Sequence, residues 1–419
     1  MSTEKMKTDV IVVGAGAAGL IAALFALRSG AHTLLIDKND KPGKKLYITG
    51  KGRCNVTNAC SLDEFLSQVP RNPRFLYSAL SRFTPEDMMN LLRSLNCDTK
   101  IERGRRVFPV SDKASDVTRA LCNAFLFGGG QIRLNTVVKR LLIDQGSVTG
   151  VETDSGEQLP ADRVILATGG LSYPSTGSTG DGYRFASDTG HRLVSPTPSL
   201  IPFVTEEDWP RQLQGLSLKN VTLTAFRGKK EIYSELGEML FTHFGVSGPL
   251  FIELSSHISS DWLPLSVFLD LKPGLSEEQL SLRLQRDFAA SGKKMLRSVL
   301  PSLLPQRLAE KIPALCGIPE DKCVSQISQP EREKIVHLLK ALPLTLSAFR
   351  PIAEAIITRG GVDVRDINPK DMQSKIVKGL YFAGEMIDVD AHTGGFNLQI
   401  AFSTGLLSGT SAAQSLQMT

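Results

Sequence analysis

The stretch from Val10 to Gly19 reads V-I-V-V-G-A-G-A-A-G in this chain of 419 residues. An apolar strand runs into three glycines with the spacing G-x-G-x-x-G, and a helix of small residues follows. Asp37 then ends a second apolar strand, Thr33–Ile36, eighteen residues after the last glycine. Strand, glycine turn, helix and delayed acid together are typical of a βαβ unit that binds a dinucleotide.

Each part of this unit has a physical purpose. Gly14 permits the tight turn out of the strand, Gly16 leaves room for a pyrophosphate, and Gly19 lets the helix pack closely on the sheet. The first turn of the helix presents free N–H groups and the positive end of its dipole, which attract phosphates. The carboxylate of Asp37 can accept hydrogen bonds from both hydroxyls of a ribose. These residues therefore predict a dinucleotide site.

The same stretch has an alternative interpretation as a membrane or export segment, because Val10–Leu27 carries no charge over eighteen residues. A spanning helix needs about 20 apolar residues, and three glycines in six positions disfavour a helix. No small-residue cleavage site follows the stretch. We therefore expect a soluble, cytoplasmic protein with no membrane span.

Composition and charge limit the possible partners. The chain is 42% hydrophobic and 22% charged with a net charge of +5, which is ordinary for a globular protein of two or three domains. Basic residues gather at 38–53 and 103–106, where they could meet a phosphate or lie on a solvated surface. Nucleic acid is not an expected partner, because no RNA-binding module is evident. The six cysteines form no C-x-x-C pair, so we predict reduced thiols and no metal site.

The order of elements predicts an α/β fold in which a Rossmann-like domain is interrupted by an insertion. Residues 1–194 and 349–419 are expected to form the nucleotide-binding domain. Prolines at 196, 198, 202 and 210 mark the start of an inserted β-rich domain, 195–273, which a helical segment follows at 274–348. Hydrophobic periodicity and turn residues place the individual elements. Strands are expected at 10–13, 33–36, 131–134, 137–143, 148–153, 163–167 and 379–383, and helices at 84–95, 115–127, 276–288, 302–312, 331–339 and 397–411.

Two strand ends carry further ligand signals. Residues 164–170 read V-I-L-A-T-G-G and resemble the A-T-G motif of two-dinucleotide-binding flavoproteins, which predicts backbone contacts at Thr168 and Gly169. Residues 379–385 read G-L-Y-F-A-G-E and resemble the C-terminal flavin motif, in which an acid after Gly384 hydrogen-bonds the ribityl chain. Most such flavoproteins have Asp where this chain has Glu385. The alternatives are a plain βα turn and a solvated acid at a strand end.

A glycine pair precedes the last helix. Residues 393–399 read T-G-G-F-N-L-Q, so the backbone at Gly395 can approach a ligand closely. If the start of the helix faces the pyrimidine edge of a flavin, its positive end would stabilise negative charge at N1 and O2. The alternative is a simple turn in which Asn397 is an ordinary helix cap.

The loop 50–58 reads G-K-G-R-C-N-V-T-N and is the most unusual stretch of the chain. Arg53 and Asn55 are expected to bond to flavin heteroatoms or to phosphate. Cys54 suggests a thiol–flavin mechanism, but no partner cysteine is adjacent. A packed, inert cysteine is the favoured interpretation.

The chain resembles the BaiN/RdsA-type NAD(P)/FAD-dependent oxidoreductases. The resemblance rests on the glycine unit, the loop 43–58, the segments 166–183 and 241–249, and the final stretch 379–405. It implies one FAD in the Rossmann-like domain, with the β-rich and helical portions inserted. It also implies FAD contacts at Gly14, Gly16, Ala18, Asp37, Lys38, Lys44, Arg53, the strand near Val138, Thr168, Gly169, Glu385, Asn397 and Leu398.

The leading hypothesis is an FAD-dependent oxidoreductase that transfers hydride between flavin and NAD(P)H, a small organic substrate, or both. Only one full dinucleotide fingerprint is visible, so NAD(P)H is expected to bind transiently. The rival hypotheses are a flavoprotein that acts on or binds RNA and a regulatory FAD-binding protein without turnover. The oligomeric state stays open.

Candidates for proton transfer are Tyr173, His243 and His392. A histidine titrates near neutral pH and suits a general acid, although a structural histidine in a turn is an equal alternative. Asp388 and Asp390 precede His392 in one loop. We expect solvated or cofactor-positioning roles for them, because two carboxylates and one histidine are weak signs of a metal.

Overall fold

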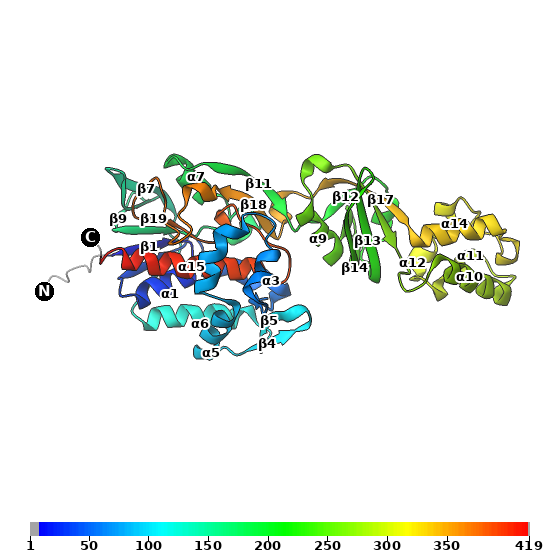
Figure 1. Ribbon diagram of the computed structural model, residues 1–419, viewed down its shortest axis with the longest axis horizontal. Coiled ribbons are helices and arrows are strands. Elements are labelled where there is room, and N and C mark those ends of the chain that lie inside the picture. The colour runs from blue at the N-terminus through cyan, green and yellow to red at the C-terminus, as the bar shows by residue number, and fades with distance from the viewer. Residues whose placement is uncertain (1–7, 418–419) are drawn as a thin grey trace. The chain divides into compact units, whose positions relative to one another are not determined.

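The computed structural model describes residues 8–417 and divides the chain into two compact units. Unit 1 comprises residues up to Ser199 together with Pro351 onward, and unit 2 comprises Leu200–Arg350. The chain thus leaves unit 1, builds unit 2 and returns, as Figure 1 shows by its colours. The expected insertion, 195–348, begins five residues before the start of unit 2 and ends two residues before the end of unit 2.

Unit 1 is built on a five-stranded parallel sheet with the order β19-β10-β1-β2-β6. Its buried side chains alternate between two faces, because successive residues of a strand point in opposite directions. Val10 and Val12 of β1 pack into one cluster with the helices α1, α6 and α15, whereas Ile11 and Val13 pack into the other. The elements are β1 (Val10–Val13), β2 (Thr33–Ile36), β6 (Gln131–Arg133), β10 (Arg163–Leu166), β19 (Leu380–Phe382), α1 (Ala17–Arg28), α6 (Ala114–Phe127) and α15 (Phe396–Gln414).

Helices α1 and α15 lie side by side against the sheet (Figure 1). Their backbones meet through small residues. A Cβ on Gly405 would come within 2.4 Å of the Ala18 carbonyl oxygen, and one on Gly409 within 2.2 Å of the Ala22 carbonyl oxygen. Only glycine fits at these two positions, so the C-terminal helix completes the core around the glycine fingerprint.

Smaller elements surround this sheet. An antiparallel meander (β7, β8, β9), a three-stranded sheet (β3, β5, β4) and a ribbon (β11, β18) are separate from it. Thr84 caps α5 in a reciprocal capping box with Asp87, which confirms the predicted helix start. These elements are β3 (Thr57–Asn58), β4 (Thr99–Glu102), β5 (Arg106–Pro109), β7 (Val138–Asp144), β8 (Ser147–Thr153), β9 (Gln158–Pro160), β11 (Leu193–Ser199), β18 (Ile357–Val362), α2 (Lys44–Ile48), α3 (Leu62–Ser67), α4 (Tyr77–Arg82), α5 (Pro85–Ser94) and α7 (Asp181–Asp188).

Unit 2 contains a closed β-barrel with the order β12-β15-β14-β13-β16-β17 and a group of helices beside it (Figure 1). The long hairpin β13–β14 turns between Arg227 and Lys230. Its elements are β12 (Phe203–Thr205), β13 (Ser217–Arg227), β14 (Lys230–Thr242), β15 (Gly245–Ser247), β16 (Leu265–Asp270), β17 (Leu342–Phe349), α8 (Trp209–Gln212), α9 (Pro249–His257), α10 (Glu277–Ser291), α11 (Leu296–Val299), α12 (Gln306–Ala309), α13 (Ile312–Cys316) and α14 (Gln329–Lys340).

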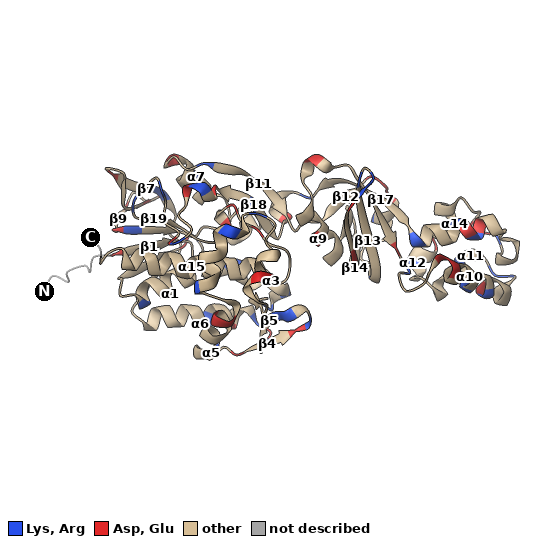
Figure 2. Ribbon diagram, in the orientation of Figure 1, with Lys and Arg blue, Asp and Glu red and all other residues tan. Residues whose placement is uncertain are grey.

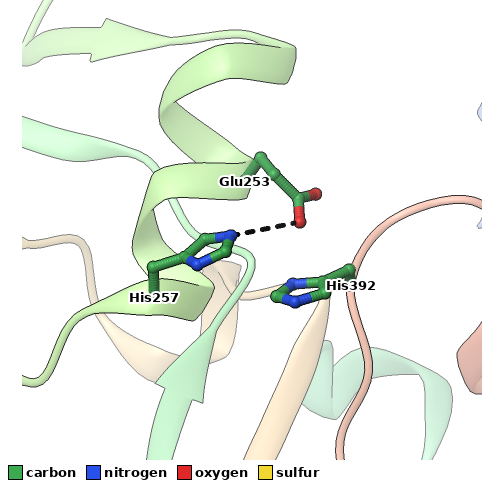
Figure 3. A group of neighbouring side chains, drawn as sticks. All are labelled: Glu253, His257 and His392. Carbon is green, nitrogen blue, oxygen red and sulfur yellow. Dashed lines mark ion pairs between the residues drawn. The ribbon is translucent and has the colours of Figure 1, made fainter. Parts of the chain in front are cut away.

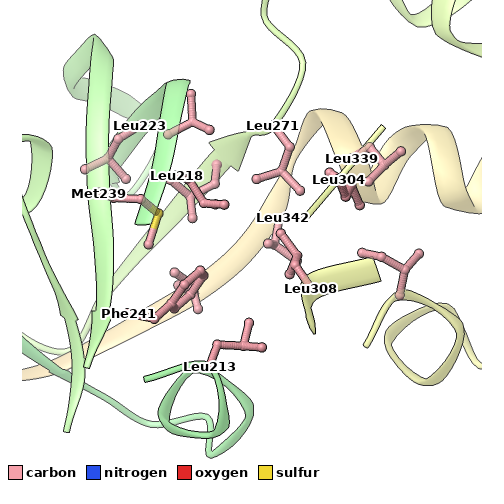
Figure 4. Close-up of a cluster of buried hydrophobic side chains, with 14 of the residues drawn as sticks. Leu213, Leu218, Leu223, Met239, Phe241, Leu271, Leu304, Leu308, Leu339 and Leu342 are labelled. Carbon is pink, nitrogen blue, oxygen red and sulfur yellow. The ribbon is translucent and has the colours of Figure 1, made fainter. Parts of the chain in front are cut away.

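One apolar core joins the barrel to the helices of unit 2. Phe241 and Leu342 of the barrel belong to the same cluster as Leu308 of α12, and Figure 4 shows them facing one another. The prediction of one helix over 302–312 is wrong. Pro305 and Pro313 divide this region into short helices, because proline cannot donate the backbone hydrogen bond that continues a helix.

No helix among residues 8–417 has the length and apolar character that a membrane crossing requires.

Candidate functional site

The three predicted ligand motifs of unit 1 meet at one edge of the parallel sheet. Parallel strands end at the same edge, and Val13, Leu166 and Phe382 are neighbours at the ends of β1, β10 and β19. Backbone hydrogen bonds tie the following residues together, from Ala167 N to the Val13 oxygen and from Ala383 N to the Leu166 oxygen, each 2.9 Å long. The glycine turn, Thr168–Gly169 and Gly384–Glu385 therefore lie together at the carboxyl ends of the strands. Ligands of open α/β sheets bind at this edge.

The three glycines of the turn have different reasons to be glycine. Gly14 has a φ of +103°, and its Cβ would come within 2.5 Å of the Ala167 oxygen. A Cβ on Gly19 would lie 1.7 Å from the Gly14 oxygen. Around Gly16, by contrast, no heavy atom of the described residues other than its chain neighbours lies within 4 Å of the added Cβ. The fold itself requires Gly14 and Gly19, whereas the space beside Gly16, at the start of α1, fits a ligand.

Asp37 lies at this edge directly after β2. Its Oδ2 accepts a 2.6 Å hydrogen bond from the N–H of Ala15 in the glycine turn. Its Oδ1 accepts bonds of 2.8 Å from the backbone N–H and the side-chain amide of Asn39. The carboxylate is thus held against the glycine turn; its role as a ribose acceptor stays a prediction.

The two lysines predicted to contact FAD make ion pairs within unit 1. Lys38 Nζ lies 2.6 Å from Asp181 Oδ2 and also bonds to Thr179. Lys44 Nζ lies 2.8 Å from Asp40 Oδ1 on the surface, and this hydrogen bond lowers the pKa of the Asp40 carboxyl. Val138, also implied as a contact, begins β7 and is buried.

Arg53 belongs to an ion-pair network on the β4–β5 hairpin. Its guanidinium bonds to Glu102, lies 2.6 Å from Asp112 Oδ1, and stacks 4.1 Å from the centre of the Phe108 ring. The bond from Arg53 lowers the pKa of Glu102, and bonds from Lys100 and Arg53 lower that of Asp112. The structure therefore gives the Arg53 side chain protein partners; its contact with FAD stays a prediction.

Cys54 is fully buried, and burial raises the pKa of its thiol to about 12. A reactive cysteine needs a thiolate at neutral pH, which this environment disfavours. The geometry supports the packed, inert cysteine over the redox thiol.

The rest of this loop meets the start of α15. Asn58 Nδ2 donates a 3.1 Å hydrogen bond to the Gly394 oxygen, and a Cβ on Gly395 would come within 2.5 Å of the Thr57 backbone. Asn55 Oδ1 and Thr57 Oγ1 are buried without a hydrogen-bond partner among the described residues. Buried polar atoms normally have a hydrogen-bond partner, so these two oxygens are free to bond to a ligand. Together with the open space beside Gly16, they show that the residues present fit a bound FAD.

Asn397 has a role that the sequence did not reveal. Its Oδ1 accepts a 2.9 Å hydrogen bond from the N–H of Ala391, and its Nδ2 donates one of 2.7 Å to the Ala391 oxygen. The side chain thus holds the loop that ends at His392. The neighbouring Leu398 is half-buried and packs against the core around α1.

Of the two roles expected for Asp388 and Asp390, solvated or cofactor-positioning, the structure contradicts the first. Asp388 is 5% exposed and accepts a 3.1 Å hydrogen bond from Asn72, and burial raises its pKa. Asp390 is fully buried, with its Oδ2 3.4 Å from Arg359 Nε. Both acids anchor the loop from inside unit 1. A buried carboxylate needs such partners, whereas the sequence shows only that it lies in a loop.

The three candidate proton donors do not belong to one unit. Tyr173 and His392 lie in unit 1, where their backbone N–H groups bond to the Ala353 and Gln68 oxygens. His243 lies in unit 2, exposed between β14 and β15, with its ring 4.9 Å from that of Phe244.

Unit 2 also contains His257, which the sequence did not single out. Its Nε2 lies 3.8 Å from Oε1 of Glu253, one turn earlier on α9 (Figure 3).

Glu385 lies in a polar cluster that the sequence did not predict. Its Oε2 is 2.6 Å from Lys45 Nζ, and its Oε1 accepts bonds of 2.9 Å from the Ser172 hydroxyl and the Thr358 N–H. Lys45 Nζ also donates a 2.6 Å bond to Ser172 Oγ. No local pattern distinguishes Lys45 from the lysines beside it, so no sequence signal could have found this cluster.

Comparison with known proteins agrees with this geometry. The family described as HI0933-like protein Rossmann domain matches residues 8–411. The chain belongs to this family. It is accordingly an FAD-dependent oxidoreductase of the BaiN/RdsA type.

Two relatives in this family extend over almost the whole chain. A protein of Haemophilus influenzae named ribosomal RNA dihydrouridine synthase is 33% identical over 95% of this chain and 96% of its own length. A protein of Clostridium scindens named 3-dehydro-bile acid delta(4,6)-reductase is 28% identical over 96% and 98%.

Solved structures show the same fold at low sequence identity. The 3-ketosteroid delta1-dehydrogenase of Sterolibacterium denitrificans has a TM-score of 0.52 at 15% identity, covering 98% of this chain and 100% of its own. The Escherichia coli quinol fumarate reductase also has a TM-score of 0.52, at 18% identity, covering 98% of this chain and 70% of its own. These likenesses confirm the expected α/β architecture with its insertion.

Proposed function

We propose that this protein uses electrons from NAD(P)H to saturate a carbon–carbon double bond conjugated to a carbonyl. The observation that carries the proposal is the chemistry shared by the names of the Haemophilus influenzae and Clostridium scindens relatives. Dihydrouridine forms when the ring double bond of uracil, conjugated to a carbonyl, is reduced. A delta(4,6)-reductase of a 3-dehydro bile acid acts on double bonds conjugated to the 3-oxo group.

The residues at the sheet edge would hold the cofactor for this reaction. Bound FAD supplies hydride chemistry at its N5 atom. The glycine turn with Gly16 would bind the diphosphate, and Asp37 would bind a ribose. Asn55 and Thr57, beside the start of α15, would direct their unpartnered oxygens at the cofactor.

Reduction of such a double bond also needs a proton on the carbon next to the carbonyl. Tyr173, His243 and His392 are the proposed donors, because phenol and imidazole side chains serve as general acids in proteins. Only one glycine fingerprint is present, so we propose that NAD(P)H binds transiently and leaves before the organic substrate is reduced.

An anaerobic titration of the FAD-loaded protein with NADH and with NADPH tests the electron donor. We expect the flavin absorption band to bleach within seconds with one of the two. A 3-oxo-4,6-diene steroid added afterwards should restore the band as it is reduced. If neither nucleotide bleaches the flavin, NAD(P)H is not the electron donor. If the flavin is instead reduced with dithionite and the dienone does not reoxidise it, the dienone is not a substrate.

The second candidate substrate is a uridine within RNA, and two observations favour it. The Haemophilus relative and its Escherichia coli counterpart, 32% identical over 94% of this chain, both have ribosomal RNA dihydrouridine synthase as their name. In addition, Arg103, Arg105 and Arg106 are exposed at the turn between β4 and β5, which Figure 2 shows in blue. These names weaken the expectation that nucleic acid is not a partner.

Mass spectrometry of RNA nucleosides distinguishes the two substrates. RNA incubated with the reduced enzyme should gain dihydrouridine if this candidate is right. Charge reversal of Arg103 and Arg106 should then lower RNA affinity and reduce its salt dependence, while Arg297→Glu in unit 2 serves as a matched control. Unmodified RNA together with salt-independent binding would eliminate the RNA substrate.

A further inference from the structure

The polar cluster around Glu385 lies next to the dinucleotide turn. A Cβ on Gly384 would come within 2.8 Å of the Ala18 Cβ in the first turn of α1. The N–H of Gly43, which precedes α2, donates a 2.8 Å bond to the Ala15 oxygen. Both Glu385 and Lys45 are therefore attached, through their neighbours, to the segment that receives the diphosphate.

The cluster joins parts of the chain that are distant in sequence. Lys45 and Glu385 are separated by 340 residues, and the Ser172 hydroxyl bonds to both. The side chains of Lys45 and Glu385 are 21% and 15% exposed, so they are neither fully buried nor free in solvent. Each oxygen of a carboxylate accepts about two hydrogen bonds, which leaves Oε2 of Glu385 an acceptor site besides Lys45.

We propose that Lys45 is a positioning residue of the flavin site. It fixes the carboxylate of Glu385 in the orientation that receives a cofactor hydroxyl, and it neutralises this carboxylate beside an anionic diphosphate. An uncompensated carboxylate at this place would repel the phosphates, because like charges within a few ångströms disfavour one another. Lys45 thus positions the carboxylate of Glu385 although it lies outside the strand-end motif that contains Glu385. This inference rests on the FAD site on which the proposed function depends.

A double-mutant cycle on FAD affinity tests the proposal. The apoprotein forms of wild type, Lys45→Met, Glu385→Gln and the double variant are titrated with FAD, and flavin fluorescence reports the Kd. We expect Lys45→Met to raise the Kd at least tenfold. In the Glu385→Gln background the same substitution should change the Kd less than threefold, because Lys45 acts through Glu385.

Two further variants separate positioning from general stability. Lys45→Arg keeps the charge and should restore most of the affinity, whereas Lys41→Met removes an exposed lysine four residues earlier and should leave the Kd unchanged. Circular dichroism of each apoprotein checks its fold; if Lys45→Met unfolds, Lys45→Gln replaces it in the cycle. A tenfold loss in both backgrounds, or no loss in either, would overturn the proposal. Turnover is not measured in this cycle, so failure of the proposed reductase activity is a distinct result.

Discussion

The cores inside the two units of this protein are packed in different ways. In unit 1, the core around α1 and α15 is rich in alanine, and glycines bring the two helix backbones into contact. In unit 2, leucine and phenylalanine side chains fill the barrel and extend among the helices. Adding atoms should therefore damage the core around α1 and α15, and removing atoms should damage the core of unit 2. A cofactor site needs the first kind of packing, because close backbones place several strand and helix ends around one ligand.

Removing a large side chain from unit 2 is expected to have the largest effect. Phe241 is fully buried and its ring lies 5.7 Å from that of Trp209. Phe241→Ala should lower the free energy of unfolding by about 3–5 kcal/mol, since it loses apolar burial and leaves a cavity. Both tryptophans of the chain, Trp209 and Trp262, lie in unit 2, so the midpoint of urea unfolding followed by tryptophan fluorescence reports this unit.

The control for this experiment is Phe241→Leu, which keeps most of the volume and should cost about 1.5 kcal/mol or less. Equal midpoints for the alanine variant and wild type would show that the core of unit 2 is not tightly packed.

Adding atoms to unit 1 comes next in size. Gly409→Val would push a Cβ to within 2.2 Å of the Ala22 oxygen, where backbone must move. We expect a loss of about 1–3 kcal/mol, the usual cost of overpacking. Far-UV circular dichroism measures the unfolding midpoint. Gly274→Val is the matched control, because nothing lies within 4 Å of its Cβ. A stable Gly409→Val protein would mean that α1 and α15 do not approach as described.

The second glycine of the fingerprint sharpens the comparison, because its space belongs to a ligand and not to the core. Gly16→Val should weaken FAD binding more than a hundredfold while changing stability by less than about 1 kcal/mol. Gly19 should behave in the opposite way, since its Cβ would strike the Gly14 oxygen at 1.7 Å. Retained flavin after dialysis of the Gly16→Val protein would place the diphosphate elsewhere.

The smallest expected effect concerns two cysteines, one in each unit. The pKa of the Cys54 thiol is raised to about 12 by burial, whereas Cys323 of unit 2 is partly exposed. At pH 8 Cys54 therefore stays protonated and shielded, and iodoacetamide should label Cys323 at least tenfold faster. Peptide mass spectrometry measures the ratio. Rapid labelling of Cys54 in the folded protein would revive the thiol–flavin mechanism.

Local chemistry was sufficient for much of the fold. The bounds of β2 agree with the predicted strand 33–36. Thr84 caps α5 by accepting a hydrogen bond from the backbone N–H of Asp87, three residues later. The structure also places the strands that end before Thr168 and Gly384 beside the strand that leads into the glycine fingerprint. Such features depend on periodicity, caps and turns, all of which act over a few neighbouring residues.

The sequence by itself determined that this chain has a dinucleotide unit, a flavoprotein order of motifs and an insertion between its two halves. Only the tertiary structure decided that Asp388 and Asp390 are buried, that Asn397 holds their loop, and that Lys45 meets Glu385. The physical reason is distance along the chain. An ion pair between residues 340 positions apart depends on which strands become neighbours in the sheet, and no local pattern encodes that order.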